Sequence, residues 1–379
     1  MAKKVAIDLT WVRHGQVGGT ESAIRNVLDG IASVNPSDMK LYLLLSSDNF
    51  DSFEMYKDVE CFEFVVTDCV SSSQKKRVVW QNRAMGSLLK ELGVTLLHEP
   101  IYGKPWFGLK GIDVTTTIHD LQAIHYPEYF SRARVLWMKA NWKHAVRTST
   151  KVVAITDYVR KDIEEHYGHG EKIQTIYNAI NLNIDQCNDE NGLAKYGIEP
   201  GGYYYTLSSL LPHKNLKTLV EALGLLKAKN SQALLPLVIS GVGGKSEEEL
   251  LELARKYDVA DKIIFTPFVD NYERNMLYKG AKVFLFPSIF EGFGMPPIEA
   301  MALSVPVLTT RCASLEEVTG GLLNYVDDPL DASEWATKLE EDYTSGGQVL
   351  KLPDEGAVAA LLARYDISCI GQQYVDLFK

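Results

Sequence analysis

Short apolar runs alternate with longer amphipathic stretches through the first half of the chain. Each run holds four to six residues, a length typical of strands buried on both faces, and the stretches between them have helical periodicity. Strands that alternate with helices predict βαβ units and a parallel sheet. The predicted strands are 5–9, 41–45, 62–66, 95–98, 115–119 and 151–156, and the amphipathic stretches include 21–33 and 78–92.

The second half repeats this pattern after a polar stretch, 181–202, that is rich in Asn, Asp and Gly and is the best linker candidate. We therefore predict an α/β protein of two Rossmann-like, doubly wound domains that face each other across a ligand-binding cleft. The predicted domains are 1–184, joined by a C-terminal helix at 365–379, and 185–364. The strands expected in the second domain are 203–208, 236–240, 262–267, 282–287 and 305–310, with helices at 214–229, 246–257 and 296–304.

Composition excludes several classes of protein. Of 379 residues, 46% are hydrophobic and 23% are charged, which excludes a disordered chain, a collagen-like repeat and a disulfide scaffold. No apolar run approaches the roughly 18 residues of a transmembrane helix, and Asp8 interrupts the apolar N-terminus, unlike a signal peptide. Five scattered cysteines without a CxxC pair suit reduced, mostly buried thiols, so we expect a cytoplasmic protein.

The net charge of −10 is unevenly distributed. Residues 1–185 hold 22 Lys and Arg against 22 Asp and Glu, so the remainder carries the whole acidic excess. An acidic C-terminal half argues against a nucleic-acid partner. Two basic stretches, 75–80 and 132–147, lie in the neutral half, and the second contains Trp137 and Trp142 but no acid.

The segment 286–310, FPSIFEGFGMPPIEAMALSVPVLTT, has the most specific chemistry in the sequence. It predicts a strand, a glycine-containing loop and a helix whose first turn holds Pro296 and Pro297. Gly292 and Gly294 would let backbone N–H groups approach a ligand, and a helix N-terminus favours an anion such as a diphosphate.

Two acids flank this predicted anion site, Glu291 before the loop and Glu299, which we expect in the first helical turn. A carboxylate accepts two hydroxyls at once, which suits the diols of a sugar or a ribose. The alternative is a tight strand-to-helix connection in which Glu299 merely complements the helix dipole.

The whole string resembles the signature of retaining GT-B glycosyltransferases of the family-4 type, in which two glutamates are separated by seven residues. Further blocks resemble the family in order and cover most of the chain, with weak zones at 46–95, 185–200 and 325–360. These blocks are 17–28, 117–131, 152–163, 176–181, 207–223 and 277–288.

The resemblance implies a role for each matching residue. Glu299 would bind the ribose of a nucleotide, and Glu291 would contact hydroxyls of the transferred sugar. Lys214 would neutralise the diphosphate, a contact of roughly 1.5–3 kcal/mol when well placed. The backbone N–H groups that would meet the same donor are those of Gly292, Phe293 and Gly294.

The chain departs from the family near Lys214. Members usually have an arginine there, where this chain has Ser209 or His213. Either His213 donates a hydrogen bond to phosphate or another cation substitutes for the arginine. Ser304 and Asn178-Ala179 also depart from the family pattern, and we interpret these changes as structural.

The N-terminal half offers weaker candidates at predicted strand ends. In the family, the loop of Gly18 and Gly19 lies against the donor phosphates and the acceptor, although a Gly-Gly pair is equally a plain turn. His119 and Asp120 end a strand at the edge where open sheets bind ligands, and the family analogue of this histidine approaches the donor sugar. The alternative for His119 is a hydrogen-bonded histidine of structural importance. His98 and Glu99 are further candidates for the same cleft.

The basic stretch 131–147 has two interpretations. It predicts either an ordinary helix with its tryptophans partly in the core or a surface that rests on anionic lipid. In the second case the protein would contact the inner face of the membrane and reach a lipid-linked acceptor.

We predict transfer of a hexose from a nucleotide diphosphate sugar to a saccharide or lipid-linked acceptor, with retention. The catalytic candidates are Glu291, His119 and Lys214. No DxD-like pair is present, and Asp327-Asp328 is typical of a loop, so we expect no metal and no cofactor. Front-face departure, usual for the family, and double displacement through a carboxylate both remain open.

Two other functions stay open, a sugar-nucleotide epimerase or phosphorylase of the same architecture and a non-catalytic nucleotide-sugar binder. EGFGMPP with PHKN resembles mannosyl- and rhamnosyltransferases of bacterial surface polysaccharide, including lipopolysaccharide. GDP-mannose is therefore the favoured donor, and a rhamnose donor is the next choice.

Overall fold

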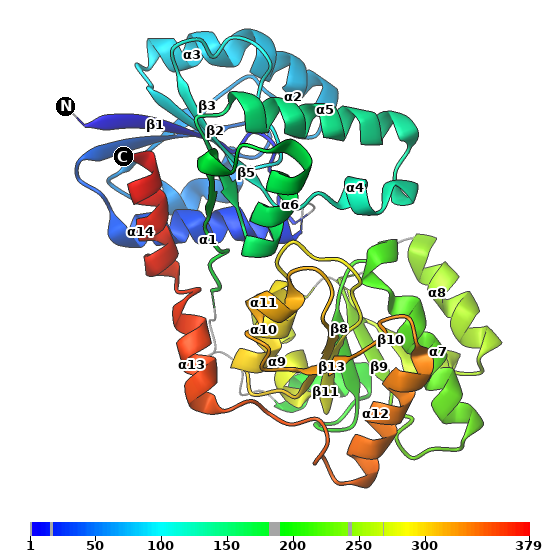
Figure 1. Cartoon of the computed structure of the whole chain (residues 1–379). Helices are drawn as coiled ribbons and strands as arrows, with labels where there is room; N and C mark the ends of the chain where they lie inside the picture. The colour runs from blue at the N-terminus through cyan, green and yellow to red at the C-terminus, as the bar shows by residue number, and fades with distance from the viewer. Residues whose placement is uncertain (1, 16–17, 182–189, 242–244, 268) are drawn as a thin grey trace. The chain divides into compact units, whose positions relative to one another are not determined.

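The computed structural model describes residues 2–15, 18–181, 190–241, 245–267 and 269–379 (Figure 1). By its internal contacts the chain divides into two compact units. The N-terminal unit is Met1–Asn181 with Arg364–Lys379, and the C-terminal unit is Leu182–Ala363. Cys187 and most of the predicted linker lie outside the described residues, and the four described cysteines are free thiols.

The N-terminal unit is built on a seven-stranded sheet in the order β3-β2-β1-β4-β5-β6-β7, with every described pairing parallel. Its strands are β1 Lys3–Asp8, β2 Met39–Leu45, β3 Phe62–Val66, β4 Leu96–Glu99, β5 Asp113–Ile118, β6 Lys151–Ala154 and β7 Ile173–Thr175. Its helices are α1 Gly19–Val34, α2 Gln74–Trp80, α3 Gly86–Glu91, α4 Gln122–His125, α5 Arg132–Thr148, α6 Asp157–Tyr167 and α14 Ile367–Phe378. Shorter helical turns are η1 Phe50–Tyr56, η2 Gln81–Met85, η3 Pro127–Tyr129 and η4 Gly170–Lys172.

The C-terminal unit has a six-stranded sheet in the order β10-β9-β8-β11-β12-β13, again parallel throughout its described pairings. Its strands are β8 Tyr204–Leu207, β9 Leu237–Ser240, β10 Ile263–Phe265, β11 Val283–Phe286, β12 Val307–Thr310 and β13 Asn324–Val326. Its helices are α7 Leu216–Ala228, α8 Lys245–Lys256, α9 Asn271–Gly280, α10 Met295–Ala302, α11 Leu315–Val318, α12 Ala332–Thr344 and α13 Glu355–Ala363, with turns η6 Glu190–Tyr196, η7 Pro212–Lys214 and η8 Ala260–Lys262.

Both sheets have the doubly wound order of a Rossmann-like fold, as the alternation of strands and helices predicts. The chain reverses direction across the sheet between β1 and β4 in the N-terminal unit, and between β8 and β11 in the C-terminal unit. Open sheets of this kind bind ligands beyond the carboxyl ends of the strands at such a point. A ligand site is therefore expected at the loops that follow β8 and β11.

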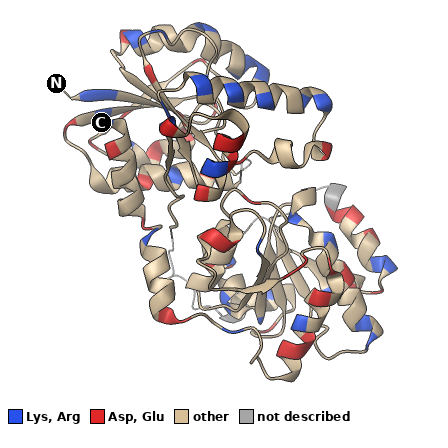
Figure 2. Ribbon diagram, in the orientation of Figure 1, with Lys and Arg blue, Asp and Glu red and all other residues tan. Residues whose placement is uncertain are grey.

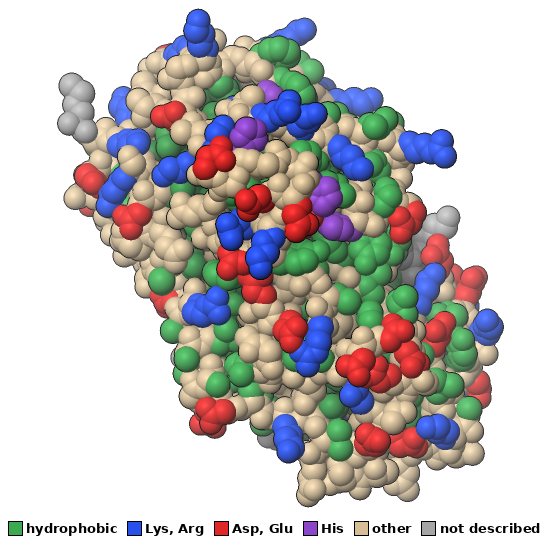
Figure 3. Space-filling view, in the orientation of Figure 1, with side chains coloured by type: hydrophobic (Ala, Val, Ile, Leu, Met, Phe, Trp, Pro, Cys, Tyr) green, Lys and Arg blue, Asp and Glu red, His purple; other side chains and the backbone are tan. Residues whose placement is uncertain are grey.

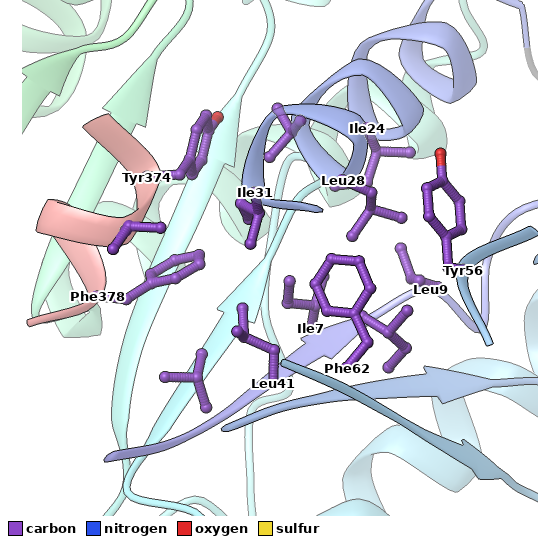
Figure 4. Packing of buried hydrophobic residues seen from close by; sticks show 14 of the residues in the cluster. Ile7, Leu9, Ile24, Leu28, Ile31, Leu41, Tyr56, Phe62, Tyr374 and Phe378 are labelled. Atoms are coloured by element: carbon purple, nitrogen blue, oxygen red, sulfur yellow. The ribbon is translucent and has the colours of Figure 1, made fainter. Parts of the chain in front are cut away.

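The C-terminal helix α14 completes the core of the N-terminal unit. Figure 4 shows Phe378 turned toward Ile31 and Leu41 within one buried apolar cluster, to which Tyr374 also belongs. The backbones of α1 and α14 cross closely, since a β-carbon added to Gly30 would lie 2.9 Å from the Cα of Gly371. Apolar burial and the close crossing at Gly30 and Gly371 hold α14 against α1. The periodicity of its sequence alone does not predict this position.

One predicted helix is divided. The amphipathic stretch 78–92 begins earlier than predicted, as α2, and then passes through η2, a π-helical segment, before α3. A β-carbon on Gly86 would lie 2.7 Å from the carbonyl carbon of Gly108, so the chain approaches this helix too closely for any larger residue. Close approach of a loop at this point accompanies the change in helical pitch.

Candidate active site

The segment singled out in the sequence forms a strand, loop and helix at the carboxyl edge of the C-terminal sheet. After β11 the loop passes through Glu291 to Gly294, which has a φ of 90° and precedes α10. Two independent reasons favour glycine at position 294. Its φ is unfavourable for other residues, and a β-carbon there would lie 2.5 Å from Cδ2 of Leu315. Ser314 holds the loop by donating to the carbonyl oxygens of Glu291, at 2.9 Å, and Phe293, at 3.2 Å.

The position predicted for Glu299 is wrong by one helical turn. Since Gly294 ends the loop, α10 begins at Met295, and Glu299 lies in the second turn rather than the first. Pro296 and Pro297 do occupy the first turn, as predicted. The helix dipole acts mainly within the first turn, so it does not account for a glutamate here.

Lys214 lies directly beside Glu291. Its Nζ donates to Oε1 of Glu291 at 2.6 Å, and the side chains of Lys214 and Glu291 are only 18% and 12% exposed. The same Nζ lies 5.7 Å from the ring centre of Phe286 at the end of β11. A half-buried ammonium between an aromatic face and a carboxylate is held far more firmly than a solvated surface lysine.

Hydrogen bonds to backbone carbonyl oxygens explain how Lys214 and Glu291, which are 77 positions apart, meet. The carbonyl oxygen of His213 accepts from the backbone N–H of Ile289, at 2.9 Å, and from the hydroxyl of Ser288, at 3.1 Å. Asn215, with a left-handed φ of 54°, donates from Nδ2 to the carbonyl oxygens of Pro287 and Pro329. These bonds tie η7 to the exit of β11 and bring Lys214 to the acid.

His213 is not a second cation. Burial and the neighbouring Lys214 lower the pKa of its imidazole to about 4, against a smaller opposite effect of Glu291. The ring is therefore neutral near pH 7. Ser209, the other position where an arginine is expected, is half-buried after β8 and carries no charge.

Glu299 is surrounded by groups from α9, which sequence reasoning missed. The hydroxyl of Tyr278 donates to Oε2 of Glu299 at 3.1 Å, and Nη1 of Arg274 lies 3.8 Å from Oε1. Burial, followed by the charge of Glu299, raises the pKa of Tyr278, so its phenol stays protonated and donates. Only the i, i+4 spacing of these residues, which places them on one helix face, could have indicated the pair.

In the N-terminal unit, Gly18 and Gly19 begin α1. Gly18 has a φ of 72° and precedes the helix, while Gly19 is its first residue. A β-carbon on Gly18 would meet no atom within 4 Å, so backbone conformation rather than crowding favours glycine there. Residues 16 and 17 of the same predicted loop lie outside the described residues.

His119 and Asp120 follow β5 at the carboxyl edge of the N-terminal sheet. Nε2 of His119 lies 2.8 Å from the carbonyl oxygen of Pro100, which can only accept, so Nε2 carries the proton. Burial lowers the pKa of the ring, which leaves Nδ1 as an acceptor. Asp120 accepts from the backbone N–H of Gln122 and from the hydroxyl of Tyr102.

His98, a further candidate for the ligand cleft, is instead a buried core residue. Its ring packs against Tyr374 and Phe378 of α14, at centroid distances of 5.5 and 5.3 Å. Burial lowers its pKa to about 3. Glu99 is also buried, and burial beside Asp8 raises its pKa well above the ordinary value.

The described residues contain no group of three or more His, Cys, Asp or Glu that could hold a metal ion. The backbone N–H groups of Asp327 and Asp328 donate to the carboxylate of Glu334, in a loop before α12. Within the part of the chain that the structure describes, no helix has the length and apolar character needed to cross a membrane.

Two family models match the chain, one on each half. "Glycosyltransferase Family 4" matches residues 17–184, and "Glycosyl transferases group 1" matches residues 190–345. Together they leave only the N-terminus, a short connecting segment and the C-terminal region unmatched.

Among curated proteins, the chain is similar to two bacterial enzymes of O-antigen synthesis. It is 29% identical over 220 residues to O-antigen chain mannosyltransferase B of Escherichia coli, covering 57% of each chain. It is 28% identical over 265 residues to O-antigen chain mannosyltransferase RfbU of Salmonella typhimurium, covering 68% of this chain and 67% of the relative. The match to the first of these spans little more than half of that relative's length.

Solved structures share the whole architecture at low sequence identity. HepE of Anabaena, in complex with UDP and glucose, has a TM-score of 0.74 at 16% identity over 99% of both chains. WaaG, a glycosyltransferase involved in lipopolysaccharide biosynthesis, has a TM-score of 0.69 at 16% identity, also over 99% of both chains. Both likenesses identify the GT-B fold.

Proposed function

Because the chain belongs to the family-4 retaining glycosyltransferases of the GT-B fold, we propose that it transfers a hexose from a nucleotide diphosphate sugar to a saccharide or lipid-linked oligosaccharide. The anomeric configuration is retained. Mannose is the favoured sugar and rhamnose the next, with GDP-mannose as the favoured donor. The names of the two O-antigen mannosyltransferases support this choice, together with the EGFGMPP and PHKN strings.

One observation carries the catalytic assignment, the contact between Lys214 and Glu291 at the carboxyl edge of the sheet. In the proposal, Lys214 donates to the leaving diphosphate and Glu291 accepts hydroxyls of the transferred sugar. Each of these contacts strengthens as charge develops on the leaving group and on the anomeric carbon, which is the requirement for lowering the barrier. Glu299 binds the ribose hydroxyls.

The backbone supplies a second source of positive potential. Gly292, Phe293 and Gly294 precede α10, and their N–H groups would meet the donor without adding a side chain that could block it. Since an N–H at a helix start favours an anion, these groups and the ammonium of Lys214 together would stabilise the diphosphate as it leaves. Gly18, Gly19, Ser209, His213 and Asp120 stay predicted donor contacts, and His119 a predicted catalytic residue.

Turnover of a donor panel tests the function. The purified chain is incubated with GDP-mannose, a TDP-linked rhamnose donor, UDP-glucose and ADP-glucose, and release of the nucleotide is followed. We expect slow hydrolysis of GDP-mannose without an acceptor and faster release with a mannose-containing oligosaccharide. An α-linked product from the α-linked donor establishes retention. Product formed equally well without any saccharide would instead indicate an epimerase or phosphorylase, and binding without turnover a non-catalytic binder.

The surface of α5 supports a proposal about where the protein works. This helix has five basic residues, Arg132, Arg134, Lys139, Lys143 and Arg147. Figure 2 marks the Lys and Arg positions along it in blue. The space-filling view shows several basic side chains on the same face of the N-terminal unit (Figure 3).

The two tryptophans of α5 have different surroundings. Trp142 is buried, whereas Trp137 is 48% exposed and Leu136 beside it is 70% exposed. Exposed aromatic and aliphatic side chains among basic ones suit the headgroup level of an anionic bilayer. We propose that the protein works in the cytoplasm and contacts the inner face of the membrane through this helix.

Vesicle sedimentation tests the membrane contact. Wild-type protein should sediment with vesicles of phosphatidylglycerol and phosphatidylcholine and should not sediment with phosphatidylcholine alone. Trp137→Ser should weaken sedimentation, while Leu225→Ser, a partly exposed position on α7 of the other unit, should leave it unchanged. Equal sedimentation of both variants and wild type would exclude α5 as the contact.

A further inference from the structure

A second cation lies in the candidate site, next to the second acid. Arg274 is on α9, which begins after Asp270, whose side chain accepts from the backbone N–H of Glu273 at 2.8 Å. This cap fixes the first turn of the helix and so directs Arg274 toward Glu299, where the two side chains are 22% and 12% exposed. The arginine is therefore mostly buried at a site that faces a carboxylate.

Glu299 does not satisfy the hydrogen-bond donors of the Arg274 guanidinium. The distance of 3.8 Å between Nη1 and Oε1 is too long for a hydrogen bond, and the nearer partner of Glu299 is the phenol of Tyr278. Nε of Arg274 is buried and has no hydrogen-bond partner among the described residues. Leaving a charged donor unpaired at a buried position is costly unless a ligand or water satisfies it.

The candidate site needs such a donor. The family's usual arginine is absent at Ser209, and His213 is neutral, so neither position supplies a positive charge. Lys214 forms an ion pair with Glu291, the acid that is proposed to bind the transferred sugar. Arg274 adjoins Glu299, the acid that is proposed to bind the ribose. The two acids therefore each have one cation beside them, contributed by different helical segments.

We propose that Arg274 is a donor-binding residue whose guanidinium contacts acceptor oxygens of the nucleotide, beside the ribose held by Glu299. The inference rests on the proposed function and extends it to a residue outside the signature. A planar guanidinium presents several N–H donors at once and suits the oxygens of a phosphate or of a base carbonyl. Tyr278 donates to Oε2 of Glu299, which leaves Oε1 and the second lone pair of Oε2 to accept the ribose hydroxyls.

Calorimetric titration with GDP, GMP and guanosine tests this assignment. Arg274→Leu should weaken GDP binding about 10- to 100-fold, as expected for a charge-assisted contact, and Arg274→Lys should restore part of the loss. Lys279→Leu, an exposed position on the same helix, should bind GDP like wild type. Circular dichroism and the melting temperature of each variant establish that it is folded.

A double variant distinguishes direct nucleotide binding by Arg274 from a purely structural role. Arg274→Leu is introduced into a chain that already carries Glu299→Gln. If Arg274 contacts the nucleotide, Arg274→Leu should still weaken binding when Glu299 is already neutralised. A loss larger for GDP than for guanosine places the contact at the phosphates, and an equal loss places it at the base; either result supports the proposal. No further loss in that background would overturn it, because Arg274 would then act only by positioning Glu299. Wild-type protein that binds none of the three would contradict GDP-mannose as the proposed donor, and the titration would then be repeated with TDP, UDP and ADP.

Discussion

Nζ of Lys214 and Oε1 of Glu291 lie 2.6 Å apart, although the two residues are 77 positions apart in sequence and belong to different βα connections. This meeting is enforced at the exit of β11, where the carbonyl oxygen of His213 accepts hydrogen bonds and Nδ2 of Asn215 donates one. In the proposed function, the cation would exchange this partner for a phosphate oxygen when a donor enters. The exchange would release the acid toward the hydroxyls of the sugar.

Replacing Lys214 should affect the diphosphate more than the nucleoside. Lys214→Met is expected to weaken GDP binding by about 1.5–3 kcal/mol and to leave guanosine binding nearly unchanged. Lys217→Met, an exposed position on α7, is the matched control. Equal weakening of GDP and guanosine would show that Lys214 supports the fold of the site rather than the phosphates.

His213 should remain uncharged throughout the neutral range. We expect its imidazole to titrate with a pKa of about 4 in a pH series of NMR spectra, because burial and Lys214 disfavour the charged form. GDP affinity should therefore show no step near pH 6.5 that His213→Asn removes. A measured pKa of 6 or more, with affinity rising as the pH falls, would instead assign His213 as the missing cation.

The glycine crossing of α1 and α14 should be sensitive to a single methyl group. Gly371→Ala places a β-carbon against the backbone of Gly30, and overpacking of this kind costs about 1–3 kcal/mol. Denaturant unfolding of the variant should show that loss. Gln372→Ala, exposed on the same helix, should change the free energy of unfolding little. Wild-type stability of Gly371→Ala would mean that the two helices are further apart than described.

His98 should make the protein sensitive to acid. Its pKa is about 3 in the folded state and about 6.5 when unfolded, so the unfolded chain binds a proton that the folded chain does not. Stability is complete above pH 6.5 and falls as the pH falls, by about 2 kcal/mol at pH 5. His98→Phe should have a shallower dependence of unfolding free energy on pH. Identical slopes would show that His98 does not titrate on unfolding.

Much of the fold follows from apolar periodicity. The predicted strands coincide with β1 to β6 and β8 to β12, because strands buried on both faces form continuous apolar runs. The strands β7 and β13 were not predicted, since each is a three-residue edge strand whose sequence has no such run. The π-helical segment η2 was not predicted either, and the approach of Gly108 to Gly86 that accompanies it is not local in sequence.

The candidate site was likewise predictable only in part. The loop around Glu291 and Gly294 could be predicted because backbone chemistry and the spacing of the acids are local in sequence. The neutral state of His213 could not, because it depends on burial and on Lys214. The role of Arg274 could not be predicted either, since its i, i+4 spacing with Tyr278 places the two on one helix face but does not indicate that Glu299 lies beside them.

The most direct test of the central claim is turnover of GDP-mannose by Glu291→Gln, measured together with its affinity for GDP. The change removes one charge and keeps the shape of the side chain. We predict that turnover falls at least about 100-fold, the scale of removing one electrostatic contact in a transition state, while the dissociation constant for GDP stays within a few-fold of wild type. Unchanged turnover with intact GDP binding would contradict the assignment of Glu291 to the reacting sugar.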